Sequence, residues 1–539
     1  MKNVRLTVVV LVLAFIMPLA LVSCGGLLYS PGTLGLEYEM LPDGTYSVSV
    51  GSAEFFENIV IPETYNGKKV TAISDNAFRE CAGLKSITIP KTITKIGLYA
   101  FYYCSNLTEV HISDIEAWCD IKCENASSNP LSYANSLYLD NKLVTELVIP
   151  EGVSVIRSVR FANCDSITSV TIPASVTEIS PSAFNGCTGI KSITVDENNP
   201  NYMSKDGDLY SKNGKILIMY AIGKDDKHVE ISNDVITIGD NAFRRCETLE
   251  SILIPNSVTS IGDEAFADCR NLQNVTVPES VTDIGDGAFG CCSGLYEAYI
   301  LGEVNSIGKN TFLACVNLVT VHIPDSVTSI GDRAFAECEK LVNISIPDGV
   351  RSIGVDAFSN CASLESVNIP NGIKTINDGA FRGCRSFEEV TIPNGVTSIG
   401  DGAFSRCEKL VKVTIPDSVN SIGEHAFYRC AWLEEISLPD GITNVAWCAF
   451  SGCSSLKSIK IPDSVTDIGE SAFSGCERLE SVFIPASVKS IGESAFWGCE
   501  GLETVYYTGS KSKWYNINYG DNNDFLTKAE KVYDYVDEN

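Results

Sequence analysis

The stretch 323–345 reads IPDSVTSIGDRAFAECEKLVNIS, and the chain repeats this pattern along most of its 539 residues. A fixed period of this kind is the signature of a repeat architecture. Sixteen copies and two insertions account for the spacing, because two of the steps between copies are 60 and 59 residues and all the others are 23. The central phenylalanines are Phe78, Phe101, Phe161, Phe184, Phe243, Phe266, Phe289, Phe312, Phe335, Phe358, Phe381, Phe404, Phe427, Phe450, Phe473 and Phe496.

The apolar spacing changes within one repeat. Around Phe335 apolar residues recur every three or four positions, which predicts a short helical turn. Ile344 and Ile346 then alternate with a polar residue, which is typical of a strand. Pro347 ends that strand, because proline has no N–H for further pairing.

The two residues in front of the turn have predicted roles in its backbone conformation and capping. Asp332 stands where an aspartate caps the first turn of a helix. Gly331 precedes it, and a later repeat has Asn377 at the same position. Since glycine and asparagine are the residues that tolerate positive φ, we expect a positive φ at this position. Ala446 in a further repeat does not fit that expectation.

One strand and one turn cannot bury their apolar sides alone, so the copies must stack on one another. The sequence therefore predicts an α/β repeat solenoid, with a leucine-rich-repeat-like parallel sheet of one strand and a short helical turn per 23-residue repeat. At a strand spacing of about 4.8 Å the sixteen strands form a face roughly 75 Å long.

The remaining segments define a domain organisation. We expect a signal peptide at 1–23, an N-terminal hairpin cap at 24–59, the solenoid at 60–502 and a C-terminal cap at 503–539. Two insertions interrupt the solenoid, at about 113–148 and 196–231. Each contains a hairpin pattern, the first turning at Asp140 and Asn141.

The N-terminus predicts export. Lys2 and Arg5 precede a short apolar stretch, as in a signal peptide. The letters LVSC at 21–24 resemble the bacterial lipoprotein signal, which implies that Cys24 carries the lipid and becomes the mature N-terminus. Two or more acyl chains suffice for a stable anchor. The absence of an aspartate at position 25, which is Gly25, points to the outer membrane if the cell has two. The alternative is a plain secretory signal with an incidental cysteine.

The pattern Leu-x-x-Val-x-Ile-Pro, followed by Val-Thr-x-Ile-Gly-x-x-Ala-Phe-x-x-Cys, resembles the BspA-type (treponemal-type) leucine-rich repeat over about residues 60–510. This resemblance implies a curved solenoid, an extracellular location on the cell surface, and adhesion to host proteins or to other microbes.

Charge narrows the classes of partner. The chain carries 40 Lys and Arg against 68 Asp and Glu, a formal net charge of −28. Such an acidic surface repels phosphate backbones, so we expect no nucleic-acid partner. The expected partners are a protein or glycan surface ligand and, through the lipid anchor, a membrane.

Sixteen of the 21 cysteines stand three residues after a repeat phenylalanine. Metal sites need clustered ligands, and cysteine is among the most buried residue types, so we expect a ladder of buried free thiols. Disulfides between neighbouring rungs are the alternative in an exported protein. Cys119 and Cys123, four residues apart in the first insertion, could form a local pair. We expect no metal and no cofactor, although the acidic stretch 206–214 leaves calcium open.

Catalytic patterns are weak. The four histidines lie apart from any nucleophile elbow or zinc motif, and the acidic residues are periodic surface positions. We expect a non-enzymatic binding protein. The alternatives are a structural surface spacer without a specific ligand and an enzyme with its site in an insertion.

The residue ten positions after each phenylalanine should point out of the sheet. Most of these residues are Ser or Thr, which suits a solvated strand. Exposed aromatic residues that interrupt such a column are candidate interface anchors, although the C-terminal cap could cover the last two. The candidate binding strip is Tyr299, His322, Lys460, Phe483 and Tyr506.

Overall fold

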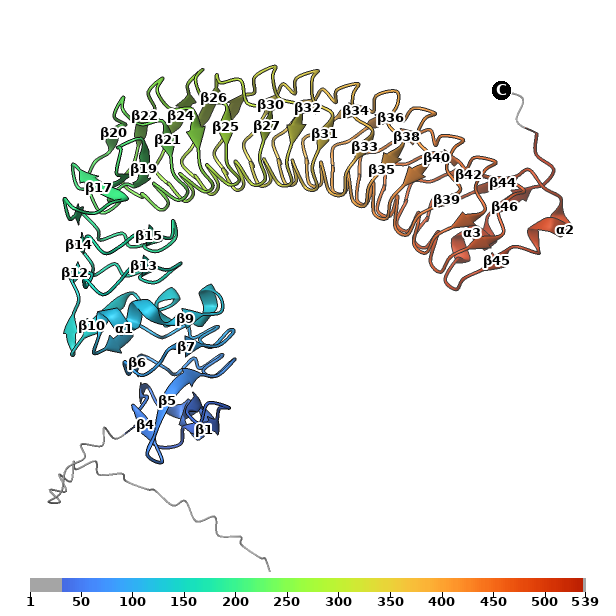
Figure 1. The fold of residues 1–539 in the computed structure, drawn as a ribbon. Coiled ribbons are helices and arrows are strands. Elements are labelled where there is room, and N and C mark those ends of the chain that lie inside the picture. The colour runs from blue at the N-terminus through green and yellow to red at the C-terminus, as the bar shows by residue number, and fades with distance from the viewer. Residues whose placement is uncertain (1–31, 537–539) are drawn as a thin grey trace, which may run out of the picture.

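The structure is a computed structural model that describes residues 32–536. The candidate lipidation residue Cys24 lies outside the described residues. The chain winds into a solenoid that bends into an arc, with the two ends of the coil far apart (Figure 1). The predicted repeat solenoid with a parallel sheet is confirmed, and the structure adds a second ladder of short strands that the sequence pattern did not reveal.

The main ladder is formed by the strands that follow each Cys-x-x-Leu segment, and it is divided into sheets of two to five strands. Within the regular repeats its members pair in parallel with the residue 23 positions away. They are β3 (Asn58–Val60), β6 (Ser86–Ile89), β8 (Glu109–Ile112), β10 (Ser136–Leu139), β12 (Glu146–Val148), β14 (Ser169–Ile172), β16 (Ser192–Val195), β20 (His228–Glu230), β22 (Ser251–Leu253), β24 (Asn274–Val277), β26 (Glu297–Ile300), β28 (Thr320–His322), β30 (Asn343–Ile344), β32 (Ser366–Val367), β34 (Glu389–Thr391), β36 (Lys412–Thr414), β38 (Glu435–Ile436), β40 (Ser458–Lys460), β42 (Ser481–Ile484), β44 (Thr504–Tyr507) and β46 (Glu530–Val532).

The short ladder is formed by the Ser-Ile or equivalent pair, which precedes a glycine in most repeats. It lies toward the inside of the arc, whereas the main ladder lies toward the outside (Figure 1). Its members are β5 (Lys68–Ile73), β7 (Lys95–Ile96), β9 (Lys122–Cys123), β13 (Val155–Ile156), β15 (Glu178–Ile179), β19 (Ile216–Met219), β21 (Thr237–Ile238), β23 (Ser260–Ile261), β25 (Asp283–Ile284), β27 (Ser306–Ile307), β29 (Ser329–Ile330), β31 (Ser352–Ile353), β33 (Thr375–Ile376), β35 (Ser398–Ile399), β37 (Ser421–Ile422), β39 (Asn444–Val445), β41 (Asp467–Ile468), β43 (Ser490–Ile491) and β45 (Asn518–Tyr519).

The segment around each phenylalanine is a run of tight turns rather than an α-helix. The N–H groups of Ala334, Ala336 and Cys338 donate to carbonyls three residues back in the same coil. The intervening N–H groups of Arg333, Phe335 and Glu337 donate instead to the next coil, with Phe335 bonding the carbonyl of Ala357 at 2.8 Å. Since alternate N–H groups bind the neighbouring coil, the segment cannot close the i→i−4 bonds of an α-helix.

The expectation that Asp332 caps its own turn is wrong. Its Oδ1 accepts from the backbone N–H of Val355, 23 residues on, at 3.0 Å. The aspartate therefore joins two coils. The same bond recurs from Asp75, Asp240, Asp263, Asp286, Asp378 and Asp401.

The expectation of a positive φ at Gly331 and Asn377 is also wrong, because neither residue is in the left-handed region. Glycine suits position 331 because the coils pack closely: a Cβ on Gly331 would lie 2.7 Å from the backbone nitrogen of Lys309 in the preceding coil. Positive φ occurs instead two residues before and two residues after the phenylalanine, as at Arg333 (54°) and Glu337 (63°).

Phenylalanine rings form the spine of the core. From Phe243 to Phe496 each ring stacks on the next, as between Phe335 and Phe358 at a centroid distance of 5.3 Å. Tyr220 extends the stack by one coil, lying 4.8 Å from Phe243. It stands 23 residues before Phe243, so the second insertion returns to the repeat register before the repeat pattern becomes visible in the sequence.

All sixteen rung cysteines are buried, and each is a free thiol. In thirteen rungs the thiol also donates to the carbonyl of the phenylalanine 26 residues earlier, and Cys338 bonds Phe312 at 3.2 Å. The same carbonyl accepts the N–H of Cys315 in its own coil. The other rungs of this kind are Cys104, Cys187, Cys269, Cys292, Cys315, Cys361, Cys384, Cys407, Cys430, Cys453, Cys476 and Cys499.

The insertions are built into the coil. The first contains α1 (Ile115–Asp120), the 3₁₀ turns η2 (Ala126–Ser128) and η3 (Pro130–Ser132), and β11 (Lys142–Leu143). Strand β11 pairs antiparallel with β10 around Asp140 and Asn141, as expected. The second contains β17 (Tyr202–Lys205) and β18 (Asp208–Ser211), which form an antiparallel unit with β19.

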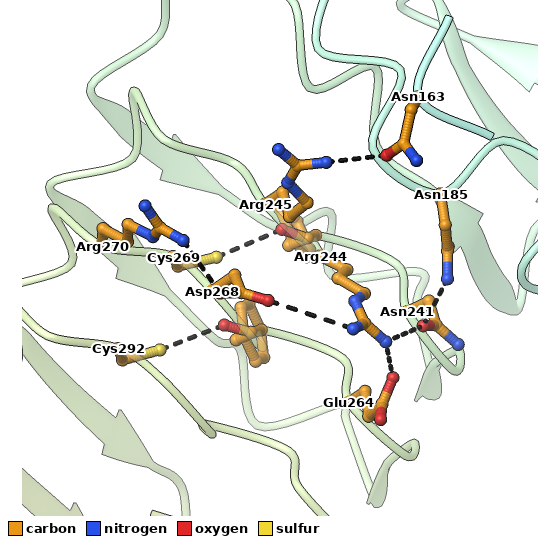
Figure 2. A network of polar contacts seen from close by, with 12 residues as sticks. Asn163, Asn185, Asn241, Arg244, Arg245, Glu264, Asp268, Cys269, Arg270 and Cys292 are labelled. Atoms are coloured by element: carbon orange, nitrogen blue, oxygen red, sulfur yellow. Dashed lines mark hydrogen bonds and ion pairs between the residues drawn. The ribbon is translucent and has the colours of Figure 1, made fainter. Parts of the chain in front are cut away.

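The second insertion divides the buried residues into two clusters, and polar side chains cross this division (Figure 2). Arg245 donates to Asn163 Oδ1 at 2.8 Å, although the two residues are 82 positions apart. Asn185 donates to Asn241 Oδ1 at 3.0 Å. These bonds join the turns on either side of the insertion.

Both ends of the described chain depart from the repeat. Strands β1 (Glu37–Met40) and β2 (Tyr46–Ser49) form an antiparallel hairpin, and β2 then pairs with β5. The 3₁₀ turn η1 (Gly51–Phe55) and β4 (Thr64–Tyr65) complete this end. At the other end, α2 (Lys511–Trp514) and α3 (Asp524–Lys528) connect strands that extend both ladders by one more coil.

We predict that the rung cysteine is needed for its size more than for its reactivity. Cys338→Ala should destabilise the protein by about 1–2 kcal/mol, through a small cavity and one lost weak hydrogen bond. Cys338→Ser should cost more, because it buries a hydroxyl in an apolar site. Local hydrogen exchange at coils 312–361 measures this effect, since long repeat arrays do not unfold in two states. Equal protection in both variants would contradict the prediction.

We also predict that stability falls in alkali. Burial raises the pKa of Cys187 from its ordinary value of 9.0 to about 12, and it raises the pKa of Cys338 and its neighbours as well. A folded state with the higher pKa retains protons that the unfolded chain releases, so its stabilisation is complete below pH 9 and is lost as the pH rises. Thermal midpoints under reducing conditions at pH 7–11 should fall less steeply when Cys338, Cys361 and Cys384 are replaced by alanine.

Candidate binding surface

The central part of the candidate strip lies on β26 and β28, where Tyr299 and His322 are direct neighbours in the parallel register. Both side chains are exposed, Tyr299 by 37%. The Tyr299 hydroxyl donates to Glu297 Oε2 at 3.3 Å, and this carboxylate raises the pKa of Tyr299. The two rings therefore stand outside the sheet as predicted, on adjacent rungs.

Sequence reasoning missed part of this central patch. Leu253 and Leu301 are 59% and 44% exposed, and Tyr296 is 53% exposed. Leu253 lies two rungs before Tyr299 in the same column, and Leu301 follows β26 directly. The signal was present in the sequence, because Leu253 replaces the usual Ser or Thr of the column. We call Leu253, Tyr296, Tyr299, Leu301 and His322 the central patch.

The C-terminal part of the strip lies on β40, β42 and β44. Lys460 pairs in register with Phe483, and Phe483 pairs with Tyr506. The Phe483 and Tyr506 rings stack at 4.6 Å with an interplanar angle of 11°. The structure therefore brings these three predicted residues together on consecutive rungs.

The chain after β46 adds a third ring to this group. Tyr535 lies 4.8 Å from the Tyr506 ring and 5.6 Å from the Phe483 ring. All three rings are half-buried, so the terminal segment covers Phe483 and Tyr506 only in part. No periodic signal could have found Tyr535, because it lies beyond the last repeat. We call Phe483, Tyr506 and Tyr535 the aromatic cluster.

The first insertion extends the outward column toward the N-terminus. His111 stacks on Tyr138 at 4.5 Å, and its Nε2 lies 3.0 Å from Glu109 Oε2. Val148, 61% exposed, pairs in register with Thr171. The outward column therefore carries apolar or aromatic side chains at its start, at its centre and at its end.

The two main patches are far enough apart to contact different parts of one partner. Eight rungs separate Tyr299 from Phe483, which is roughly 40 Å at the spacing of adjacent strands. The column between them is polar, with Ser345, Asn368 and Thr391 all exposed. Such an arrangement can bind an extended surface through two groups of anchors.

The cysteine pair of the first insertion is part of the core. Cys119 is buried and Cys123 is nearly so, and both are free thiols. Burial raises the pKa of Cys119 to about 12. Arg160, which stands where most repeats have alanine, is fully buried and donates to Cys123 Sγ at 3.9 Å. Its guanidinium also lies 5.4 Å from the Trp118 ring, so this group closes the insertion against the coil.

The acidic stretch in the second insertion is paired internally. Asp208 is buried, and its Oδ1 accepts from Lys224 Nζ at 2.7 Å and from the N–H of Ala221 at 2.8 Å. Within residues 32–536 no group of three or more His, Cys, Asp or Glu side chains is arranged to hold a metal ion. In the same range no helix is long and apolar enough to cross a membrane.

Comparison with known proteins identifies the repeat. The profile of the BspA type leucine rich repeat region, which spans six copies, matches residues 48–132, 132–206, 223–341, 305–433 and 397–522. Together these matches cover most of the chain. No curated protein matches the sequence significantly.

Solved structures of bacterial leucine-rich repeat proteins are similar to this chain. One from Eubacterium ventriosum is 22% identical and covers 71% of this chain and 94% of its own, with a TM-score of 0.46. A leucine rich cell surface protein from Faecalibacterium prausnitzii is 28% identical and covers 92% and 99%, with a TM-score of 0.37. One from Bacteroides ovatus is 24% identical and covers 94% and 100%, with a TM-score of 0.40. At these TM-scores the repeat profile, and not the superpositions, carries the assignment.

Proposed function

This chain belongs to the BspA-type leucine-rich repeat family, and we propose that it is a lipid-anchored cell-surface protein that binds a protein partner through the outward face of its main ladder. The aromatic cluster at the end of that face carries the proposal. A partner that covers these three half-buried rings would remove their remaining exposed area from contact with water. Aromatic residues are enriched among interface anchors.

The charge of the chain supports a basic partner. A net charge of −28 attracts a cationic surface and accelerates its association, an effect that salt screens. The cluster would then supply most of the affinity, and the acidic excess would supply the rate and the salt dependence.

The alternative function, a structural surface spacer, does not require the outward aromatic residues. A spacer needs the core but has no use for outward aromatic rings, and Thr or Ser in their place would serve equally well. The polar column between the two patches fits either function. Binding by the aromatic cluster is therefore the property that separates the two proposals. A catalytic function has no comparable support, because the grouped polar side chains of the insertions are engaged in packing contacts.

We predict that Phe483→Ser combined with Tyr506→Thr restores the polar column and abolishes binding. Anchors of this kind commonly contribute 2 kcal/mol or more each, about thirtyfold in affinity. The full chain in detergent micelles, used to capture partners from host and microbial surface extracts, identifies the partner. Surface plasmon resonance at two salt concentrations then compares the two forms of the protein. Affinity for the captured partner should also fall as the salt concentration rises.

Thr391→Ser combined with Thr414→Ser is the matched control, because it changes two exposed residues of the same column between the patches. Unchanged binding by the aromatic double variant would exclude the cluster as the site. A markedly lower thermal midpoint of that variant would show that the two rings belong to the core beneath the terminal segment.

We further predict that Cys24 anchors the protein. Cys24→Ala should remove the chain from the membrane fraction or leave it uncleaved, because the acceptor for the lipid is lost. Mass spectrometry of the mature N-terminus measures the modification directly. An unmodified Cys24 in the wild-type protein would refute the anchor while leaving the binding proposal intact.

A further inference from the structure

A hollow of about 600 Å³ opens on the side of the solenoid formed by the tight turns, away from the outward face of the main ladder. Its volume lies within the range of about 300–1,000 Å³ that is typical of ligand sites. It extends over the coils of Phe358 to Phe427. The residues that line it are Asn360, Arg382, Asp401, Gly402, Ser405, Arg406, Glu424, His425 and Tyr428.

Three glycines lie in the turns at the hollow, and Gly402 is part of its lining. Gly379 and Gly402 occupy the position two residues before the phenylalanine, and Gly383 occupies the position two residues after it, all with positive φ. Neighbouring coils carry Asp356 and His425 at the first of these positions. The backbone of these turns tolerates side chains, as Arg333 shows at φ 54°. A Cβ at Gly379, Gly383 or Gly402 would meet Asp356, Asn360 or Arg382, so the absent side chains leave the room into which these neighbouring side chains extend.

Two arginines lie at this space. Arg382 extends across the glycines, since a Cβ on Gly402 would lie 3.2 Å from its Nη2. Its Nη2 is 3.8 Å from Asp356 Oδ1, too long for a hydrogen bond, and that buried oxygen has no hydrogen-bond partner among the described residues. Arg406 is exposed and lines the hollow, and its guanidinium makes no ion pair within the described part of the chain. Two cationic forks thus face one opening in a strongly acidic protein.

The rings of His425 and Tyr428 line the next side of the hollow, and Trp447 stands beside His425. The His425 ring lies 5.3 Å from Tyr428 and 4.4 Å from Trp447, edge to face in both cases. Trp447 is 43% exposed. The Arg429 guanidinium lies 5.2 Å from the Tyr428 ring. The rings offer flat apolar surfaces beside the arginines.

Carboxylates complete the lining and restrict the class of ligand. Asp401 and Glu424 are exposed at the hollow, and Asp401 Oδ1 accepts only the backbone N–H of Glu424, at 2.8 Å. These acids would repel a polyanion, but they accept hydrogen bonds from hydroxyl groups. Arginine forks suit a single carboxylate in bidentate geometry. The lining therefore matches a molecule with many hydroxyls, few negative charges and a flat apolar ring face.

We propose that this hollow binds a short acidic oligosaccharide with a single carboxylate. The carboxylate would lie on Arg382 and Arg406, a pyranose face against Tyr428, and hydroxyls on Asp401, Glu424 and Asn360. The site is separate from the outward strand face and does not depend on the protein partner proposed for that face. The ligand class follows from combining cationic forks with acidic acceptors and exposed rings.

Isothermal titration calorimetry on the full chain in detergent tests this site with sialyllactose, a trisaccharide that carries a single carboxylate. The probe should bind, and Arg406→Gln and Arg382→Gln should each weaken binding about tenfold or more. Arg333→Gln is the matched control, since Arg333 is an exposed arginine on the same side of the solenoid, three coils before Arg406. This variant should bind the sugar as the wild type does. Gly402→Asn should weaken binding without lowering the thermal midpoint, because Asn310 already occupies the equivalent position at positive φ.

Three results would overturn the proposal. The first is no binding of sialyllactose by the wild-type chain, and the second is equal binding of the neutral trisaccharide galactosyllactose, which would remove the role of the carboxylate. The third is tighter binding of a triglutamate peptide than of the sugar, which would assign the hollow to acidic peptides. The Phe483→Ser and Tyr506→Thr variant should bind the sugar normally, which separates this site from the outward face.

Discussion

The carbonyl of each repeat phenylalanine is the point on which the solenoid depends. It accepts the N–H of the cysteine in its own coil and, in thirteen rungs, the thiol of the cysteine in the next. The ring of the same residue stacks on its counterpart 23 residues away. One residue therefore joins the local turn to the neighbouring coil through both backbone and side chain. A coil without a neighbour would lose both contacts, which is why the repeats have to be stacked.

This arrangement leaves two columns of side chains free to vary. In the main ladder the outward residue has no role in the core, and in the turns the residues two positions before and after the phenylalanine point away from the stack. The turns hold their shape for glycine, arginine, aspartate or histidine alike, because their hydrogen bonds are made by backbone groups. Such a scaffold can change its surface chemistry coil by coil without changing its fold.

Different residues connect the core and the turns across the second insertion. Tyr220 takes the place of a phenylalanine in the stack, and the Arg245–Asn163 and Asn185–Asn241 bonds join the turns on both sides. The tyrosine hydroxyl finds a partner in Asp226 at 2.8 Å, which keeps the polar end of the ring satisfied. The step from Phe184 to Tyr220 is therefore 36 residues instead of 23, and the core still resumes its register.

The sequence alone determined the period, the solenoid, the parallel main ladder, the buried thiol column and the outward position of Tyr299, Phe483 and Tyr506. Each of these follows from equivalence: a residue that recurs every 23 positions must occupy the same place in every coil. Only the tertiary structure decided which neighbouring coil a side chain reaches. Asp332 bonds the next coil instead of its own turn, Tyr535 packs against Tyr506, and side chains from four coils line one hollow. A period shows which residues are alike, but contacts between coils depend on backbone direction and on the space left by absent side chains, and neither is written in the spacing of the letters.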